Sequence, residues 1–211
     1  MFKYSIVISS VLIAPVIQNL MTGISKGCFM KGNGEADVFI DGMHFQHIME
    51  NLKVKGIDYE KFSDKIANRK RGRTYYFDAL PYKSPGAIKP QNYAKKESFL
   101  SKLNYLKGFQ VEKGYVKIET KKCDNCGKDI GIPKQKKVDV LIATRLIERS
   151  FEVDTLVLIA GDADFVPAIE VAKRKAKIVL GYCDGITARE LIQISDEKIE
   201  LSAAYFNDCK R

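Results

Sequence analysis

The chain has 211 residues, enough for one α/β domain with a well-formed core, and its composition is that of a globular rather than a disordered protein. The formal net charge of +9 is unevenly spread. Residues 65–137 carry 19 Lys and Arg against 6 Asp and Glu, whereas residues 138–211 carry 10 against 13 and residues 30–64 carry 4 against 7. A basic middle between acidic flanks predicts a polyanionic partner such as RNA, although a lysine-rich surface that only aids solubility would give the same counts.

The cysteine content argues against a secreted scaffold. The number of cysteines is odd and only one pair is closely spaced, so no disulfide framework is predicted. We therefore expect a reducing compartment and a cytoplasmic protein. The five are Cys28, Cys123, Cys126, Cys183 and Cys209.

Residues 1–29 form an apolar segment whose role the sequence leaves open. The run from Ile6 to Ile17 is interrupted only by Ser9, Ser10 and Pro15, and it is shorter than the roughly 20 residues of a membrane helix. It has the length of a signal-peptide core, but no clear small-x-small cleavage site follows. A mis-assigned translation start, with the domain beginning at Met30, is the preferred interpretation. A signal or anchor and a packed N-terminal segment are the alternatives, and no membrane partner is expected unless the segment is genuine.

The first half of the domain, taken as residues 30–211, predicts strands alternating with helices. Residues 36–41 form an apolar strand that ends in an acid, and a second strand, residues 74–78, does the same. Helical spacing of apolar residues predicts helices over residues 43–53, 59–67 and 92–106. Residues 69–73 are a basic loop, and prolines mark a loop over residues 81–90.

The second half continues the alternation. Residues 109–112 and 115–119 predict a strand with a hairpin extension, followed by a Lys- and Gly-rich loop over residues 120–137. Helices are predicted over residues 138–150, 163–175 and 187–194, and buried strands over 155–160 and 177–182. This order predicts an α/β protein with a mostly parallel sheet covered by helices on both faces.

Acidic residues follow the ends of the predicted strands. Asp162 and Asp164 come directly after the buried strand and, in an extended chain, would lie on one side of it. Asp41 ends the first strand, and Asp139 opens the helix after Lys137. Because the carboxyl ends of parallel strands meet at one edge of a sheet, these four carboxylates are predicted to converge there and to hold Mg²⁺ or Mn²⁺.

The sequence gives less support to a purely structural role for these acids or to a different kind of catalytic site. Asp162 capping the following helix is the simplest structural role, but a cap needs only one acid. The sequence has no Gly-rich phosphate loop and no dinucleotide fingerprint. A Ser/His/Asp arrangement is not suggested, since His44 and His47 are the only histidines. A bound divalent cation would instead favour hydrolysis of a phosphodiester.

Four short motifs stand in a recognisable order over residues 37–201: Phe39-Ile-Asp-Gly42, Tyr75-Tyr-Phe-Asp78, Lys137-Val-Asp-Val140 and Gly161-Asp-Ala-Asp-Phe-Val-Pro167. In these motifs the chain resembles the NYN domain, the PIN-like family that includes LabA-type proteins. The resemblance implies a three-layer α/β/α sandwich and a divalent-metal ribonuclease site. By position it assigns the metal-binding and catalytic roles to Asp41, Asp139, Asp162 and Asp164, and Asp196 matches a further acid, although it could equally cap a helix.

Three positions differ from the family pattern. His44 stands where Asn is usual, Ala160 where Ser or Thr is common, and Arg145 where many members have an acid. His44 can still bind a metal or a phosphate, or be an ordinary residue at a helix start. Arg145 could replace a cation's charge or contact a phosphate.

Cys123 and Cys126 have the Cys-x-x-Cys-Gly spacing of half a zinc ribbon within the basic insertion at residues 113–137. A structural zinc needs four ligands, and no second such pair exists in the sequence. Zinc would therefore need donors from distant residues or from a second subunit in a homodimer. A metal-free turn is the alternative.

The basic region supplies candidate RNA contacts. Lys137 is the strongest of these because it directly precedes the motif of Asp139, and tyrosines could stack on bases, although Tyr75 and Tyr76 are better explained as core. We expect a ribonuclease acting on single-stranded or structured RNA. The alternatives are a non-catalytic RNA-binding or regulatory protein, or an adaptor with a silent acidic pocket. The remaining candidate contacts are Arg69, Lys70, Arg71, Arg73, Tyr115, Lys121, Lys122, Lys134 and Lys136.

Overall fold

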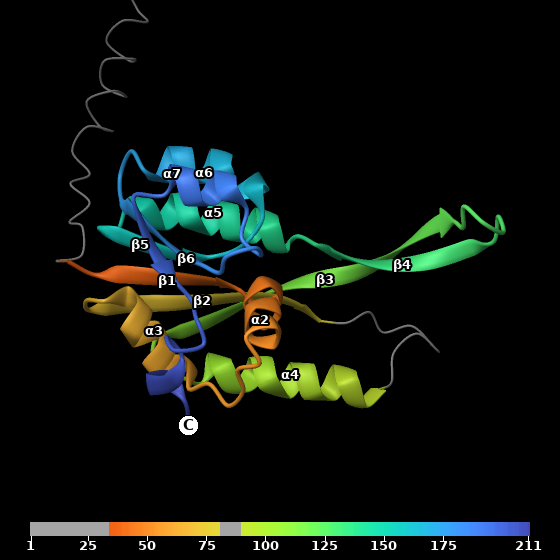
Figure 1. The fold of residues 1–211 in the computed structure, drawn as a ribbon, viewed down its shortest axis with the longest axis horizontal. Helices are drawn as coiled ribbons and strands as arrows, with labels where there is room; N and C mark the ends of the chain where they lie inside the picture. The colour runs from red at the N-terminus through yellow and green to blue at the C-terminus, as the bar shows by residue number, and fades with distance from the viewer. Residues whose placement is uncertain (1–33, 81–89) are drawn as a thin grey trace, which may run out of the picture. The chain divides into compact units, whose positions relative to one another are not determined.

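The computed structural model describes residues 34–80 and 90–211 (Figure 1). The predictions for residues 1–29 and for the proline-rich loop at residues 81–89 lie outside this part. Within it, seven strands form one sheet in the order β4-β3-β2-β1-β5-β6-β7, and only the β3–β4 pair is antiparallel. The predicted α/β class with a mostly parallel sheet is therefore confirmed. The strands are β1 (Ala36–Asp41), β2 (Arg71–Leu80), β3 (Phe109–Lys122), β4 (Asp129–Lys136), β5 (Thr155–Ile159), β6 (Lys177–Tyr182) and β7 (Glu197–Glu200).

Helices cover both faces of this sheet, giving three layers (Figure 1). One face packs against α2 (Gly42–Asn51), α3 (Tyr59–Ala67), α4 (Pro90–Asn104) and the short 3-10 turn η2 (Asn207–Cys209). The other packs against α5 (Val138–Ser150), α6 (Val166–Ala172) and α7 (Arg189–Ile194).

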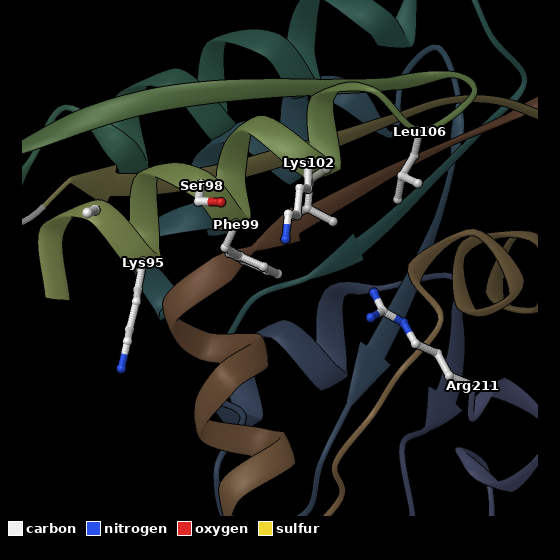
Figure 2. A pocket seen from close by; sticks show the side chains of 8 residues that line it. Lys95, Ser98, Phe99, Lys102, Leu106 and Arg211 are labelled. Carbon is white, nitrogen blue, oxygen red and sulfur yellow. The ribbon is translucent and has the colours of Figure 1, made fainter. Parts of the chain in front are cut away.

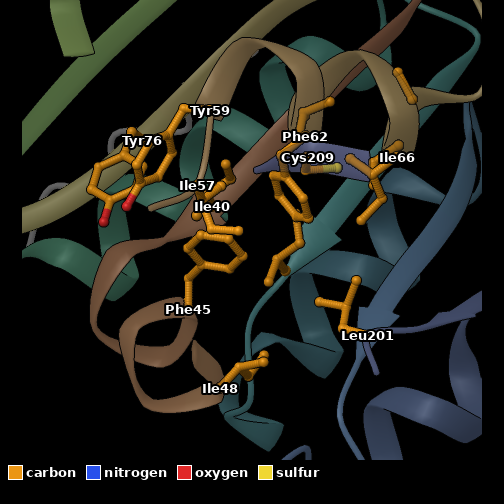
Figure 3. Packing of buried hydrophobic residues seen from close by; sticks show 14 of the residues in the cluster. Ile40, Phe45, Ile48, Ile57, Tyr59, Phe62, Ile66, Tyr76, Leu201 and Cys209 are labelled. Carbon is orange, nitrogen blue, oxygen red and sulfur yellow. The ribbon is translucent and has the colours of Figure 1, made fainter. Parts of the chain in front are cut away.

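The sheet separates two apolar cores because β1 and β5 are buried on both faces, as near-continuous apolar strands of a parallel sheet should be. On the first face, Phe45 of α2 and Phe62 of α3 pack together with ring centroids 4.8 Å apart (Figure 3). Adjacent side chains of β2 go to opposite cores: Tyr76 packs in the first and Tyr75 in the second. Both tyrosines are buried, as predicted for core residues.

A long two-stranded hairpin replaces the predicted loop at residues 120–137. β3 pairs with β2 as far as Tyr115, and from Tyr115 to Lys122 it pairs instead with β4. The two strands extend beyond the rest of the sheet (Figure 1), and we refer to residues 115–136 as the arm. The prediction of a loop was wrong because most side chains of the arm are exposed, so the sequence carries little apolar alternation there.

Two smaller predictions were also wrong, and one strand was not predicted. Arg71 and Arg73 belong to β2 rather than to a loop, since the backbone N–H of Arg73 donates to Asp37 Oδ1 of β1 at 2.7 Å. The predicted helix at residues 163–175 is divided into a 3-10 turn, η1 (Ala163–Phe165), and the shorter α6. The edge strand β7 was not predicted, because its sequence, Glu-Lys-Ile-Glu, has only one apolar residue.

A buried ion pair joins the sheet to α5. Asp37 is fully buried, and its Oδ2 accepts a hydrogen bond of 2.6 Å from Arg149 Nε. Together with the bond from Arg73, this satisfies a carboxylate that would otherwise be costly to bury. Among residues 34–80 and 90–211, none of the helices is both long and apolar enough to cross a membrane.

Candidate functional site

A hollow of about 800 Å³ lies at the carboxyl edge of the central strands. Three of the four predicted acids, Asp41, Asp139 and Asp162, line it. Asp41 comes from the end of β1, Asp162 from the residues after β5, and Asp139 from the first turn of α5. The topology therefore brings together acids that are up to 121 positions apart in the sequence. The rest of the lining is Met43, His44, His47, Lys134, Gly161, Ala163, Ile186 and Ala188.

Asp41 both caps α2 and faces the hollow. Its Oδ1 accepts hydrogen bonds from the backbone N–H groups of Met43 at 3.0 Å and His44 at 3.3 Å. Burial nevertheless raises the pKa of Asp41 to about 6, and the charges of Asp139 and Asp78 add to the increase. Its carboxylate is thus held in a place where a positive charge would stabilise it.

Asp139 is presented by a strained joint between the arm and α5. Lys137 has a φ of 79°, a left-handed conformation that is unusual for a residue with a Cβ. Its carbonyl accepts the first helical hydrogen bond, from Leu141 N at 3.0 Å. Burial raises the pKa of Asp139, and the charges of Asp162 and Asp164 raise it further.

Asp162 and Asp164 differ from the extended arrangement that was predicted. Asp162 caps the 3-10 turn η1, with its Oδ1 accepting from Asp164 N at 2.9 Å. Asp162 lines the hollow, whereas Asp164, within the 3-10 turn, is not among the residues that line it. The alternative prediction of a cap therefore holds for Asp162, and one of its oxygens remains available to the hollow.

His44 packs directly on Gly161. A Cβ at position 161 would overlap the imidazole ring, so this contact requires glycine. His44 Nε2 lies 3.5 Å from Thr187 Oγ1. Burial lowers the pKa of His44 to about 4, with a smaller contribution from His47, so the ring is neutral at neutral pH.

The donors that line the hollow are three carboxylates and the imidazoles of His44 and His47, a set that suits a divalent cation such as Mg²⁺ or Mn²⁺. Burial and neighbouring carboxylates raise the pKa values of Asp41 and Asp139, so a cation there would favour their charged forms. In the part of the chain that the structure describes, no three His, Cys, Asp or Glu side chains are grouped closely enough to hold an ion by themselves. A cation in the hollow would therefore need water or substrate phosphate to complete its shell, as Mg²⁺ commonly does in sites with one or two carboxylates.

The predicted RNA contacts are divided between two ends of the sheet. Lys134 of β4 lines the hollow, and Lys137 is exposed at the start of α5. Arg71 and Arg73 lie instead at the amino-terminal end of β2, where Arg71 is held by Asp64 at 2.5 Å. The structure places them away from the acids.

Two further predicted residues are engaged elsewhere. Arg145 donates to Glu112 at 2.8 Å and to Glu148 at 2.6 Å, and its guanidinium lies over the ring of Tyr75. It therefore joins α5 to β3 rather than facing the hollow. Asp196 accepts from Ile178 N at 2.8 Å, at the beginning of β6 and thus at the edge opposite the acids.

The sequence did not indicate several of the residues that line the hollow. Met43, Ile186, Ala188 and His47 all line the hollow. His47 follows His44 by one helical turn, so the helical spacing of the two histidines was the available signal. Ile186 and Ala188 come from the loop before α7 and carry no such signal.

A second hollow, of about 550 Å³, lies along α4 and has a different character (Figure 2). Lys95, Lys102 and Arg211 surround an apolar floor that includes Phe99 and Leu106, and among the described residues no Asp or Glu lines it. It lacks the donors for a hard cation, so we do not take it as the candidate site.

Comparison with known proteins shows the family to which this chain belongs. The model of the NYN domain matches residues 35–202, and the chain belongs to this family. The fold is that of PIN-like nucleases. A protein of unknown function from Vibrio parahaemolyticus has a similar crystal structure, with a TM-score of 0.54 and 18% identity over 85% of this chain and 99% of that one. None of the curated proteins matches the chain.

Proposed function

We propose that the protein is a divalent-metal-dependent ribonuclease. The convergence of Asp41, Asp139 and Asp162 on one hollow, with Lys134 of the basic arm on its wall, carries the proposal. Membership in the NYN family supports it, since NYN domains are generally RNA-binding nucleases of PIN-like fold. Mg²⁺ or Mn²⁺ is the proposed cofactor, and Asp164, whose charge raises the pKa of Asp139, is a further acid close to the site.

In the proposed mechanism the chain's own residues position the reacting groups. Asp41, Asp139 and Asp162 would supply the carboxylate ligands of the cation, with water and substrate phosphate completing its shell. When bound, the cation would lower the pKa of a water molecule and stabilise charge on the phosphate. Lys134 binds the RNA backbone where it enters the hollow. The neutral ring of His44 offers a hydrogen bond to a phosphate or to water without adding charge.

The test is RNA cleavage with Mn²⁺ by wild type, Asp162→Asn and Asp41→Asn. Each variant is expected to lose activity by on the order of 100-fold or more, because the cation supplies several kcal/mol of transition-state stabilisation. Glu170→Gln, an exposed change on α6, is the control and should cleave like wild type. Wild-type activity in Asp162→Asn and Asp41→Asn would contradict the proposed site.

A non-catalytic RNA-binding or regulatory protein is the second candidate. The observation that favours it is the absence, within the described residues, of a ready-made group of three metal ligands. In that case salt-sensitive RNA binding would persist with EDTA, and no condition with Mg²⁺ or Mn²⁺ would give cleavage.

A cytoplasmic location is part of both proposals, and the four free cysteines that the structure describes support a reducing environment.

A further inference from the structure

The turn at the tip of the arm has the backbone of a metal-binding knuckle. Cys123 N donates to Lys128 O at 2.8 Å, and Gly127 N donates to Cys123 O at 2.9 Å. Gly127 has a φ of 65°, which closes the turn. The N–H groups of Asn125 and Cys126 point at the sulfur of Cys123 and, with the Cys126 thiol, lower its pKa. Two thiols therefore stand side by side on a preformed and accessible turn.

This pair cannot be completed from the described part of the same chain. Cys183 and Cys209 are buried in the first core, and no group of three or more possible ligands occurs among the described residues. The arm carries its tip away from the body of the sheet (Figure 1). A zinc ion bound at the tip needs two more ligands from outside.

We propose that one Zn²⁺ joins the tips of two copies of this chain, each giving Cys123 and Cys126. Two identical pairs provide the four thiolates of a structural site and close with two-fold symmetry. The proposal concerns the tip alone and is independent of the ribonuclease proposal.

The charges around the turn suit this arrangement. A Zn²⁺ with four thiolates carries a net charge of −2, and the exposed Lys122 and Lys128 of both tips would lie around it. Lys121 is also exposed and lies 3.7 Å from Asp124 in the same turn. Without the metal, these lysines would repel one another and keep the tips apart.

The experiment is to measure bound zinc and molecular mass on the reduced full-length protein, with a reductant that does not chelate metals. We expect about one zinc per two chains, a dimer by analytical ultracentrifugation, and dissociation to monomers when a chelator removes the zinc. Co²⁺ in place of zinc should give the strong visible absorption of tetrahedral thiolate coordination.

Three variants make the outcome specific. Cys123→Ser and Cys126→Ser should each lose the zinc and the dimer while keeping the circular dichroism spectrum of wild type, because the tip is exposed. Cys28→Ser should keep both. One zinc per monomer, a dimer that survives chelation, or no zinc binding would each overturn the proposal.

Discussion

The imidazole of His44 lies against Gly161 so closely that a methyl group at position 161 would occupy the space of the ring. This contact joins the start of α2 to the turn that carries Asp162. We expect Gly161→Ala to displace His44 from Thr187 and to destabilise the protein by about 1–3 kcal/mol, as overpacking does. Urea denaturation measures the change.

The double variant Gly161→Ala/His44→Ala tests the cause. Removing the ring relieves the overlap, so the double variant should lose less stability than the sum of the two single variants. Additive losses would show that the backbone at position 161, rather than the ring of His44, resists the substitution.

A second prediction concerns pH and Asp41. Its pKa is raised by burial from 3.8 to about 6, so the folded protein holds a proton there that the unfolded chain lacks. Stability from this group is present at low pH and is lost as pH rises from about 4 to about 6. Asp41→Asn, which keeps an amide that can cap α2, should remove that loss and be more stable than wild type at neutral pH. Thermal denaturation across this range checks it.

His44 should make the stability of the fold depend on pH in the opposite direction. Its pKa is lowered by burial from 6.5 to about 4, so the unfolded chain takes up a proton that the folded protein refuses. This contribution is present above pH 6.5 and is lost as pH falls toward 4. His44→Gln should remove it, and a variant with unchanged pH dependence would show that the ring is not buried in solution.

The buried pair of Asp37 and Arg149 gives a fourth prediction. Asp37→Ala leaves the guanidinium and the N–H of Arg73 without their acceptor, and we expect a loss of about 3–5 kcal/mol in the free energy of unfolding. Asp208→Ala is the matched control, since its pair with Lys65 is largely exposed and should contribute less than about 1 kcal/mol. Equal losses in the two variants would contradict the burial of Asp37.

The fifth prediction tests whether Lys134 contacts RNA. Lys134→Ala should weaken RNA binding and reduce the slope of log affinity against log salt by about 0.7, the value for one phosphate contact on a single strand. Lys70→Ala is the matched control, because Lys70 pairs with Glu35 as Lys134 pairs with Glu119, but it precedes β2 at the other end of the strands. Fluorescence anisotropy in EDTA measures binding without cleavage, and an unchanged slope in Lys134→Ala would count against the arm as an RNA contact.

The sequence predicted the parts of the fold that burial dictates. The runs that became β1 and β5 are apolar because both of their faces are covered, and the helical spacing of Phe45 and Ile48 follows from packing on one core. The convergence of Asp41, Asp139 and Asp162 was predictable for the same reason, since parallel strands have their carboxyl ends at one edge.

The features that were not predicted depend on contacts between distant residues, which leave no pattern in the neighbouring sequence. The arm is exposed along both faces, so its strands lack apolar alternation. β7 is a strand because it pairs with β6, and its own sequence does not indicate this. Arg145 looked like a substrate contact, but Glu112, 33 positions away, lies beside it and binds its guanidinium. Asp164 lies in a 3-10 turn, which the short sequence after β5 does not distinguish from an extended chain.

The length of the arm also determines how long a ligand must be to contact both its tip and the acidic hollow. Lys134, which lines the acidic hollow, pairs with Lys117, and from Lys117 to Lys122 the backbone of the arm spans about 17 Å at ~3.3 Å per residue. A ligand that touches the hollow and the tip together must be at least that long, so a dinucleotide reaches only one of them. Affinity should therefore rise with oligonucleotide length until the strand covers the arm, and then level off.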